Sequence, residues 1–155
     1  IVDVYLERLP AALRTSDGRV LDGVIALLDV LAGSNAVLGL ATGNVQRGAE
    51  LKLRYFGLWE HFCVGGFGDY SLERSELIAA AIEAGVQAAE TNRDAVDVLV
   101  IGDPPRDVAA AHAAGVRALG VASGAYDSRQ LRDSGADFVL PDLADLQADL
   151  AILLS

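Results

Sequence analysis

The sequence predicts an α/β fold in which parallel strands alternate with helices on both faces of a doubly wound sheet. Short apolar runs alternate with segments whose apolar residues recur at helical spacing, a pattern typical of such sheets. Polar residues follow three of the apolar runs directly, and the carboxyl ends of parallel strands are where these folds build sites. Hydrophobic residues make up 52% of the 155 residues, enough for one domain with a full core.

The composition argues against nucleic acid and membranes as binding partners of this protein. The net charge is −10 and no cluster of Lys or Arg interrupts it, so we expect no nucleic acid partner. No apolar run reaches the roughly 18 residues of a membrane span, and the first residues do not have the pattern of a signal peptide. The single cysteine, Cys63, excludes an internal disulfide and fits a reducing compartment. We therefore expect a cytoplasmic protein without a membrane partner.

The first residues differ from the rest. Residues 1–19 are more charged, carry no strand pattern and show one amphipathic helix that Pro10 is expected to end or kink. We therefore treat 1–19 as the end of a helical cap and 20–155 as the core. A second helix is expected at 21–31, where Gly33 stops it.

Five apolar runs are predicted to be strands. Residues 96–101 form the clearest one, because an unbroken apolar stretch ends abruptly at Gly102-Asp103. Residues 63–67 form a weaker one. In chain order, the strands are expected at 36–41, 63–67, 96–101, 116–121 and 138–140.

Helices are predicted after each strand from apolar residues at helical spacing and from start and stop residues. Ser71 can cap one helix, and Asp103 before Pro104 is a good start for another. That helix is rich in alanine, which lets it lie close to a sheet. These helices are expected at 45–56, 72–89, 104–114, 128–134 and 143–153.

Three strand ends carry polar groups that can converge at one edge of the sheet: Thr42-Gly43-Asn44, the loop at 65–69, and Gly102-Asp103. Thr42 offers a hydroxyl, and Gly43 and Asn44 offer backbone N–H groups at a helix start, which suit phosphate oxygens. Asp103 and Asp107 offer the hard oxygen ligands that suit Mg²⁺.

Lys52 and Arg74 are the cations best placed to balance a phosphate. Each residue also has a plain structural alternative. Thr42, Asn44 or Asp103 can simply cap a helix, Asp107 can sit in a first turn because the helix dipole favours it, and Lys52 and Arg74 can be solvated surface charges.

The combination of Leu-Gly-Leu-Ala-Thr-Gly-Asn (38–44) with Val-Leu-Val-Ile-Gly-Asp-Pro-Pro-Arg-Asp (98–107) resembles the haloacid dehalogenase-like hydrolase superfamily, and within it the phosphoglycolate-phosphatase-like group. Val-Leu-Asp-Gly-Val (20–24) is similar to the family's entry into its core, and 137–143 is similar to its closing segment. The resemblance covers roughly residues 20–150 and implies a three-layer Rossmannoid core with a remnant of a helical cap.

The resemblance implies a Mg²⁺-dependent phosphomonoester hydrolase that works on a small phosphorylated metabolite through an aspartyl-phosphate. Thr42 matches the second motif and would bind the phosphoryl group with Gly43 and Asn44. Arg74 stands where the third motif normally has a lysine, and Lys52 is the other candidate for that role. Asp103 matches the metal-binding acid of the fourth motif, with Asp107 beside it.

One expected motif is missing. The family's Asp-x-Asp, which supplies nucleophile and general acid/base, ends a strand at the centre of the sheet, and no such pair follows an apolar run here. The resemblance therefore implies that the chain starts inside the cap, is inactive by itself, and leaves two strand edges unpaired, a route to self-association. The alternative is a non-catalytic binding or regulatory module with the same fold.

Overall fold

Parallel strands form the middle layer of the protein. A computed structural model describes residues 1–145, and within them the strands form two separate sheets. In the first sheet, residues of β1 pair in register with β2, from Gly39 with Val64 to Thr42 with Phe67. In the second, β4 lies between β3 and β5. The strands are β1 (Gly39–Thr42), β2 (Val64–Phe67), β3 (Leu99–Gly102), β4 (Arg117–Val121) and β5 (Phe138–Leu140).

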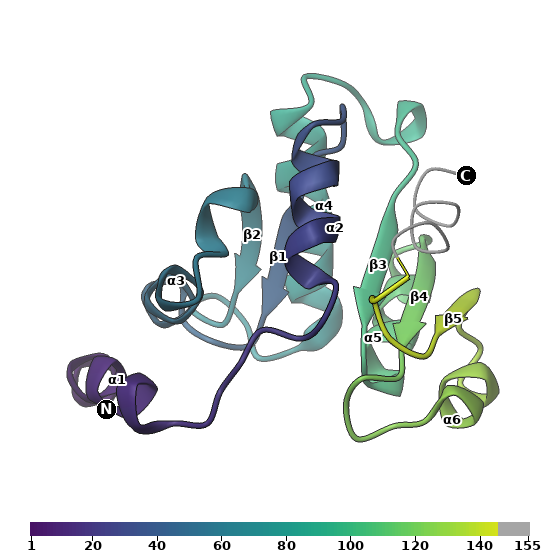
Figure 1. Ribbon diagram of the computed structural model, residues 1–155. Helices are drawn as coiled ribbons and strands as arrows, with labels where there is room; N and C mark the ends of the chain where they lie inside the picture. Colours follow the sequence, from purple (N-terminus) through teal and green to yellow (C-terminus); the bar gives the residue numbers. More distant parts are fainter. Residues whose placement is uncertain (146–155) are drawn as a thin grey trace.

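A cleft separates the two sheets. It has a volume of about 580 Å³, and residues of both β1 and β3 line it. Apolar side chains of α2 (Val24–Ala32) and α4 (Arg74–Ala88) complete its walls. Figure 1 shows that β1 and β3 belong to separate parts of the strand layer, with α2 running alongside on the near side. Within residues 1–145, β1 pairs only with β2 and β3 only with β4, so each strand has an edge that no other described strand covers.

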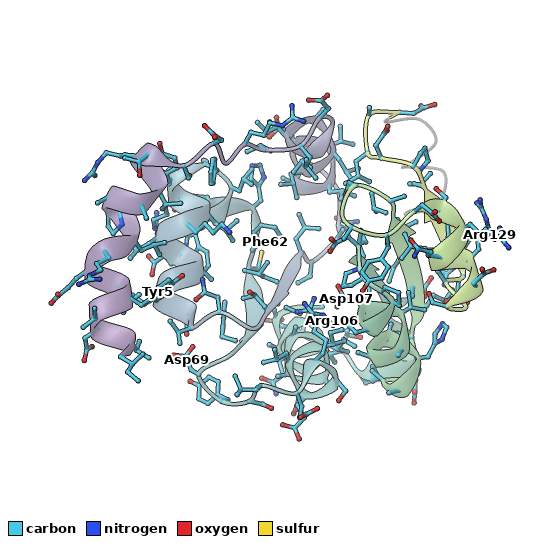
Figure 2. The ribbon with its side chains drawn as sticks, turned by 90° about the horizontal axis from the view of Figure 1, so that it is seen from below. Tyr5, Phe62, Asp69, Arg106, Asp107 and Arg129 are labelled. Atoms are coloured by element: carbon cyan, nitrogen blue, oxygen red, sulfur yellow. The ribbon has the colours of Figure 1, made fainter. Side chains whose placement is uncertain are left out.

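Helices cover both faces of the strands. On one face α4 packs on β1 and β2, and α5 (Pro105–Ala113) packs on β3 and β4. These two helices also pack against each other, so they join the two sheets on that side. The helix α2 lies on the opposite face (Figures 1 and 2). The remaining elements are α1 (Val2–Thr15), α3 (Gln46–Tyr55), α6 (Ser128–Asp133) and the 3-10 turns η1 (Trp59–His61) and η2 (Arg93–Ala95).

The best-buried core surrounds β4. Ala118 and Leu119 are both 1% exposed, and Leu131 of α6 is fully buried. On the α5 side, Val108 and Ala111 pack against β4 residues. The small alanines of α5 let this helix approach the sheet closely, as the sequence suggested.

The order and type of the predicted strands and α-helices agree with the structure, and the differences lie at their ends. The strands predicted at 36–41 and 96–101 begin later, at Gly39 and Leu99. The first helix does not end at Pro10, because α1 continues to Thr15. Ser71 does not cap α4; its hydroxyl accepts a hydrogen bond from the Glu73 N–H (3.0 Å), and the helix begins at Arg74. The predicted helix at 143–153 lies mainly outside the described residues.

The α/β fold class with parallel strands and helices on both faces is confirmed. The division into a cap remnant at 1–19 and a core at 20–155 stays a prediction, since α1 packs on α3 of the core. Among the helices within residues 1–145, none combines the length and the apolar character needed to cross a membrane.

Candidate functional site

The loops that follow β1, β2 and β3 leave the sheets at their carboxyl ends. Figure 2 views the protein from below, toward this edge, and shows Asp107 near the centre and Asp69 on the side of the first sheet. The backbones after β1 and β2 approach each other closely, because the Gly68 N–H donates to the Asn44 carbonyl (2.9 Å). The predicted convergence of the first two loops is therefore present.

The Thr42–Asn44 loop is held by its own side chains. The Asn44 N–H donates to Thr42 Oγ1 (3.2 Å), and Asn44 Nδ2 donates to the Tyr5 hydroxyl (2.9 Å). Neither side chain caps α3. The N-cap residue of this helix is Val45, whose side chain makes no capping hydrogen bond. The capping alternative for Thr42 and Asn44 is therefore wrong, and Gly43 lies exposed between them.

The carboxylate of Asp69 lies at the N-terminus of α3, where the sequence predicted that an anion could bind. Its carboxylate accepts a hydrogen bond from the Gln46 N–H (2.5 Å), the first residue of α3. A carboxylate is stabilised there by the helix dipole and satisfies a backbone donor that has no partner within the helix. Sequence reasoning placed the loop at 65–69 on this edge but gave Asp69 no role. An acid following a strand at the shared edge was the available signal.

Asp103 directly follows β3. The N-cap of α5 is Pro104, with Pro105 as the first helical residue and no side-chain cap, so the prediction that Asp103 caps this helix is wrong. The side chain is exposed, and within the described residues it makes no hydrogen bond or ion pair. It lies against Gly124, where a Cβ would overlap Asp103 Oδ2.

Arg74 and Asp107 form a buried two-point ion pair. Arg74 Nε lies 2.6 Å from Asp107 Oδ1, and Arg74 Nη2 lies 3.1 Å from Oδ2. Arg74 Nη1 donates to the Ala41 carbonyl at the end of β1 (2.9 Å). The two side chains are only 25% and 6% exposed. Gly102 makes room for the Asp107 carboxylate, because a Cβ there would overlap Oδ2.

This arrangement links the two sheets at their carboxyl ends. Arg74 belongs to the helix behind β1 and β2, whereas Asp107 belongs to the helix behind β3 and β4. A charge-assisted pair with two parallel hydrogen bonds fixes relative orientation better than a single contact. Arg74 is therefore not the solvated surface charge that its plain alternative predicted, whereas Asp107 does lie in the first turn of α5, as its own alternative predicted.

Lys52 lies in a different environment. It is exposed in the last turn of α3, a helix that runs away from the edge. Of the two cations named from the sequence, the one that contacts residues of this edge is therefore Arg74.

The donor set for a metal is smaller than predicted. Asp103 is open and offers the hard oxygens that Mg²⁺ prefers, but both oxygens of Asp107 are engaged by Arg74. Within residues 1–145, no group of three or more His, Cys, Asp or Glu side chains is close enough to hold a metal ion. Asp103 fits Mg²⁺ as one ligand among several, whereas Asp107 fits a metal only if it leaves Arg74. The metal-binding roles stay predictions.

Comparisons with known proteins found similarity to hydrolases and phosphatases. The family model described as "HAD-hyrolase-like" matches residues 76–146, a stretch that contains Asp103 and Asp107. "Probable phosphatase IndB" of Dickeya dadantii is 28% identical over 138 residues.

Solved structures share the fold. A hydrolase from Pseudomonas syringae is 28% identical with a TM-score of 0.71, covering 88% of this chain and 61% of its own. A predicted phosphoglycolate phosphatase from Haemophilus somnus has a TM-score of 0.73 at 22% identity, covering 96% of this chain and 62% of its own.

The matched proteins are longer than this chain. The alignment spans 86% of this chain but only 57% of the Dickeya dadantii protein. About two fifths of that relative therefore have no counterpart in the aligned region, so its whole activity does not transfer to this chain without further argument.

Proposed function

We propose that this chain, which is similar to haloacid dehalogenase-like hydrolases, is the larger part of a Mg²⁺-dependent phosphomonoester hydrolase acting on a small phosphorylated metabolite. One observation carries the proposal. Arg74 contacts both the end of β1 and Asp107 behind the end of β3. These contacts hold the polar residues that follow β1 close to those that follow β3.

In this proposal the first strand end holds the phosphoryl group. Thr42 would donate its hydroxyl to a phosphoryl oxygen, and the exposed backbone N–H of Gly43 and the second hydrogen of the Asn44 side-chain amide would add further donors. Arg74 would take the third-motif role in preference to Lys52, because its guanidinium carries a positive charge to the end of β1. Its planar group donates in fixed directions, unlike a lysine ammonium, and two of its nitrogens already hold Asp107.

Asp103 would hold the Mg²⁺ ion, and the cation would supply positive charge to balance the phosphoryl oxygens. The protein needs such compensation, because its net charge is −10 and would otherwise oppose an anionic substrate. In the described arrangement, Asp107 serves to orient Arg74. Water and further oxygen ligands would complete the coordination of the ion.

The cleft between β1 and β3 is where we place the missing nucleophile strand. Its walls carry two unpaired strand edges and apolar side chains, which suits a strand buried on both faces in a parallel sheet. Such a strand would end between Thr42 and Asp103. We propose that a segment upstream of Ile1 supplies it together with the nucleophilic aspartate.

An activity assay tests the proposal. We expect the 155-residue chain with Mg²⁺ to show no turnover of p-nitrophenyl phosphate, and we expect a version extended upstream to show turnover. In the extended protein, Asp103→Asn should reduce turnover on the order of 100-fold or more, whereas Asp94→Asn, a change to an exposed acid in η2, should leave it unchanged. Turnover by the 155-residue chain that Asp103→Asn abolishes would show that the nucleophile lies within it.

A second candidate is a binding or regulatory module of the same fold. It is favoured by the Arg74–Asp107 pair, which leaves Asp103 as the one open carboxylate of the two. The upstream coding sequence separates the candidates. An Asp-x-Asp at the end of an apolar run supports the enzyme, and a start codon close to Ile1 supports the module.

We also propose that the 155-residue chain self-associates through the edges of β1 and β3. Ile101 of β3 is 40% exposed, and an uncovered strand edge can pair with another chain. Sedimentation velocity should show concentration-dependent oligomers for this chain and a monomer for the upstream-extended protein. A monomeric 155-residue chain at all concentrations would contradict this proposal.

A further inference from the structure

The helix α1 reaches the Thr42–Asn44 loop with one polar side chain. α1 packs against α3, and Figure 1 shows it at the outer end of a long connection that leads to α2. Tyr5 lies between α1 and α3 (Figure 2) and is 38% exposed. Its hydroxyl accepts the hydrogen bond from Asn44 Nδ2 at 2.9 Å. The contact joins residues 39 positions apart in the sequence.

Asn44 also makes hydrogen bonds within its own loop and with the loop after β2. Its N–H donates to Thr42 Oγ1, and its carbonyl accepts from the Gly68 N–H. The side-chain amide, the backbone N–H and the carbonyl are thus each committed to a different element. Because one residue makes all three contacts, a shift of Asn44 as a whole would move its backbone contacts with Thr42 and Gly68 together.

A glycine makes the contact possible. At the buried Gly48 of α3, a Cβ would lie 2.7 Å from Tyr5 Cε1 and 2.8 Å from Asn44 Oδ1. Both distances are too short for real contacts, so any larger residue would push the pair apart. Glycine in a helix costs about 1 kcal/mol relative to alanine. The interior position therefore gives up helix stability while it admits Tyr5 beside Asn44.

We propose that Tyr5 is a positioning residue that couples the docking of α1 to phosphate binding at the Thr42–Asn44 loop. The inference rests on the proposed phosphate site. Tyr5 holds the Asn44 side chain, which keeps the loop in the arrangement with Gly43 exposed between two fixed neighbours. Because coupling between two sites is reciprocal, phosphate bound at the loop must stabilise docked α1 to the same degree.

The test uses inorganic phosphate as the probe and the 155-residue chain as the protein. Phosphate is titrated while the amide signals of residues 42–44 are followed by NMR, and hydrogen exchange of residues 2–15 is measured with and without phosphate. In the unmodified chain we expect shifts at the loop and slower exchange in α1. Tyr5→Phe should weaken phosphate binding roughly fivefold and remove the effect of phosphate on α1.

Two further variants separate this role from general packing. Tyr55→Phe removes a hydroxyl that makes no hydrogen bond within the described residues, at the far end of α3, and should bind phosphate like the unmodified chain. Gly48→Ala favours the helix itself but displaces Tyr5, so it should weaken phosphate binding in the same direction as Tyr5→Phe.

The outcomes distinguish the two proposals. If the unmodified chain does not shift at residues 42–44 with phosphate, the proposed phosphate site is wrong and the coupling falls with it. If it does shift, but Tyr5→Phe binds phosphate equally well or α1 exchange ignores phosphate, the coupling alone is wrong.

Discussion

The strands β3 and β4 are neighbours with similar apolar sequences, yet only one is buried. Four of the five residues in β4 are buried, whereas no residue of β3 is. The difference follows from their neighbours: β4 has a strand on each side, while β3 has the cleft on one side. β1, on the opposite wall, has no buried residue either. Burial of an apolar strand is thus decided by what lies beside it.

The first test of this comparison uses one large apolar residue from each strand. Leu119 of β4 is 1% exposed and Ile101 of β3 is 40% exposed. Leu119→Ala should lower the free energy of unfolding by about 3 kcal/mol, since it leaves a cavity in a packed core. At concentrations where the chain is monomeric, Ile101→Ala should lower it by less than about 1 kcal/mol, because the side chain already contacts solvent. Urea unfolding measures both.

The same pair of variants can show that the β3 edge is covered in solution. If Ile101→Ala costs as much as Leu119→Ala, the cleft is filled in solution by a part of this chain or by a second copy. Sedimentation of the Ile101→Ala variant would then separate these two occupants.

The second prediction concerns the ion pair that joins the two sheets. Arg74→Ala leaves the carboxylate of Asp107, with its side chain 6% exposed, without its partner. We expect a loss of about 2–3 kcal/mol in the free energy of unfolding. Adding Asp107→Asn should recover part of this loss, because the unpaired charge is then gone.

Arg54 provides the matched control. It pairs with Glu50 and Glu60 but is 51% exposed, and exposed ion pairs contribute little to stability because water screens the charges. Arg54→Ala should therefore change stability much less than Arg74→Ala. Equal losses for the two variants would show that the Arg74–Asp107 pair does not hold the sheets together.

The smallest expected change in stability concerns Asp137, beside the sheet of β3, β4 and β5. Asp137, just before β5, accepts hydrogen bonds from the Ala118 N–H (2.8 Å) and from His112 Nε2 of α5 (2.9 Å). The hydrogen bond with His112, and then that with Ala118, lower the pKa of Asp137 below its ordinary value of 3.8. The ionised carboxylate therefore stabilises the fold above that value, and the contribution is lost as the pH falls through the lowered pKa.

Asp137→Asn should lower the free energy of unfolding by about 0.5–1 kcal/mol at pH 5.5. The difference from the unmodified chain should shrink as the pH falls from 3.8 through the lowered pKa of Asp137, because the carboxyl group takes up a proton first in the unfolded state and then in the folded state. Urea unfolding at pH 5.5 and at pH 3 measures this. A difference that grows toward low pH would contradict the assignment.

The sequence located the strand ends of the candidate site but not the contacts between them. Thr42, Asp103 and Asp107 were found because an apolar run followed by polar residues marks the carboxyl end of a buried strand. Asp69 and Tyr5 were missed for different reasons. Asp69 follows a weak strand, and Tyr5 belongs to a helix whose place relative to the strands has no local signal.

The sequence by itself determined the kind and order of the elements, because hydrophobic period and start and stop residues act over a few neighbouring positions. It also marked Gly102-Asp103 and Thr42-Gly43 as strand ends. Only the tertiary structure decided that Arg74 holds Asp107, that Asp103 stays open, and that Tyr5 holds Asn44. Each of these depends on which side chains from distant segments meet, and hydrogen bonds and ion pairs form only at contact distances that packing sets.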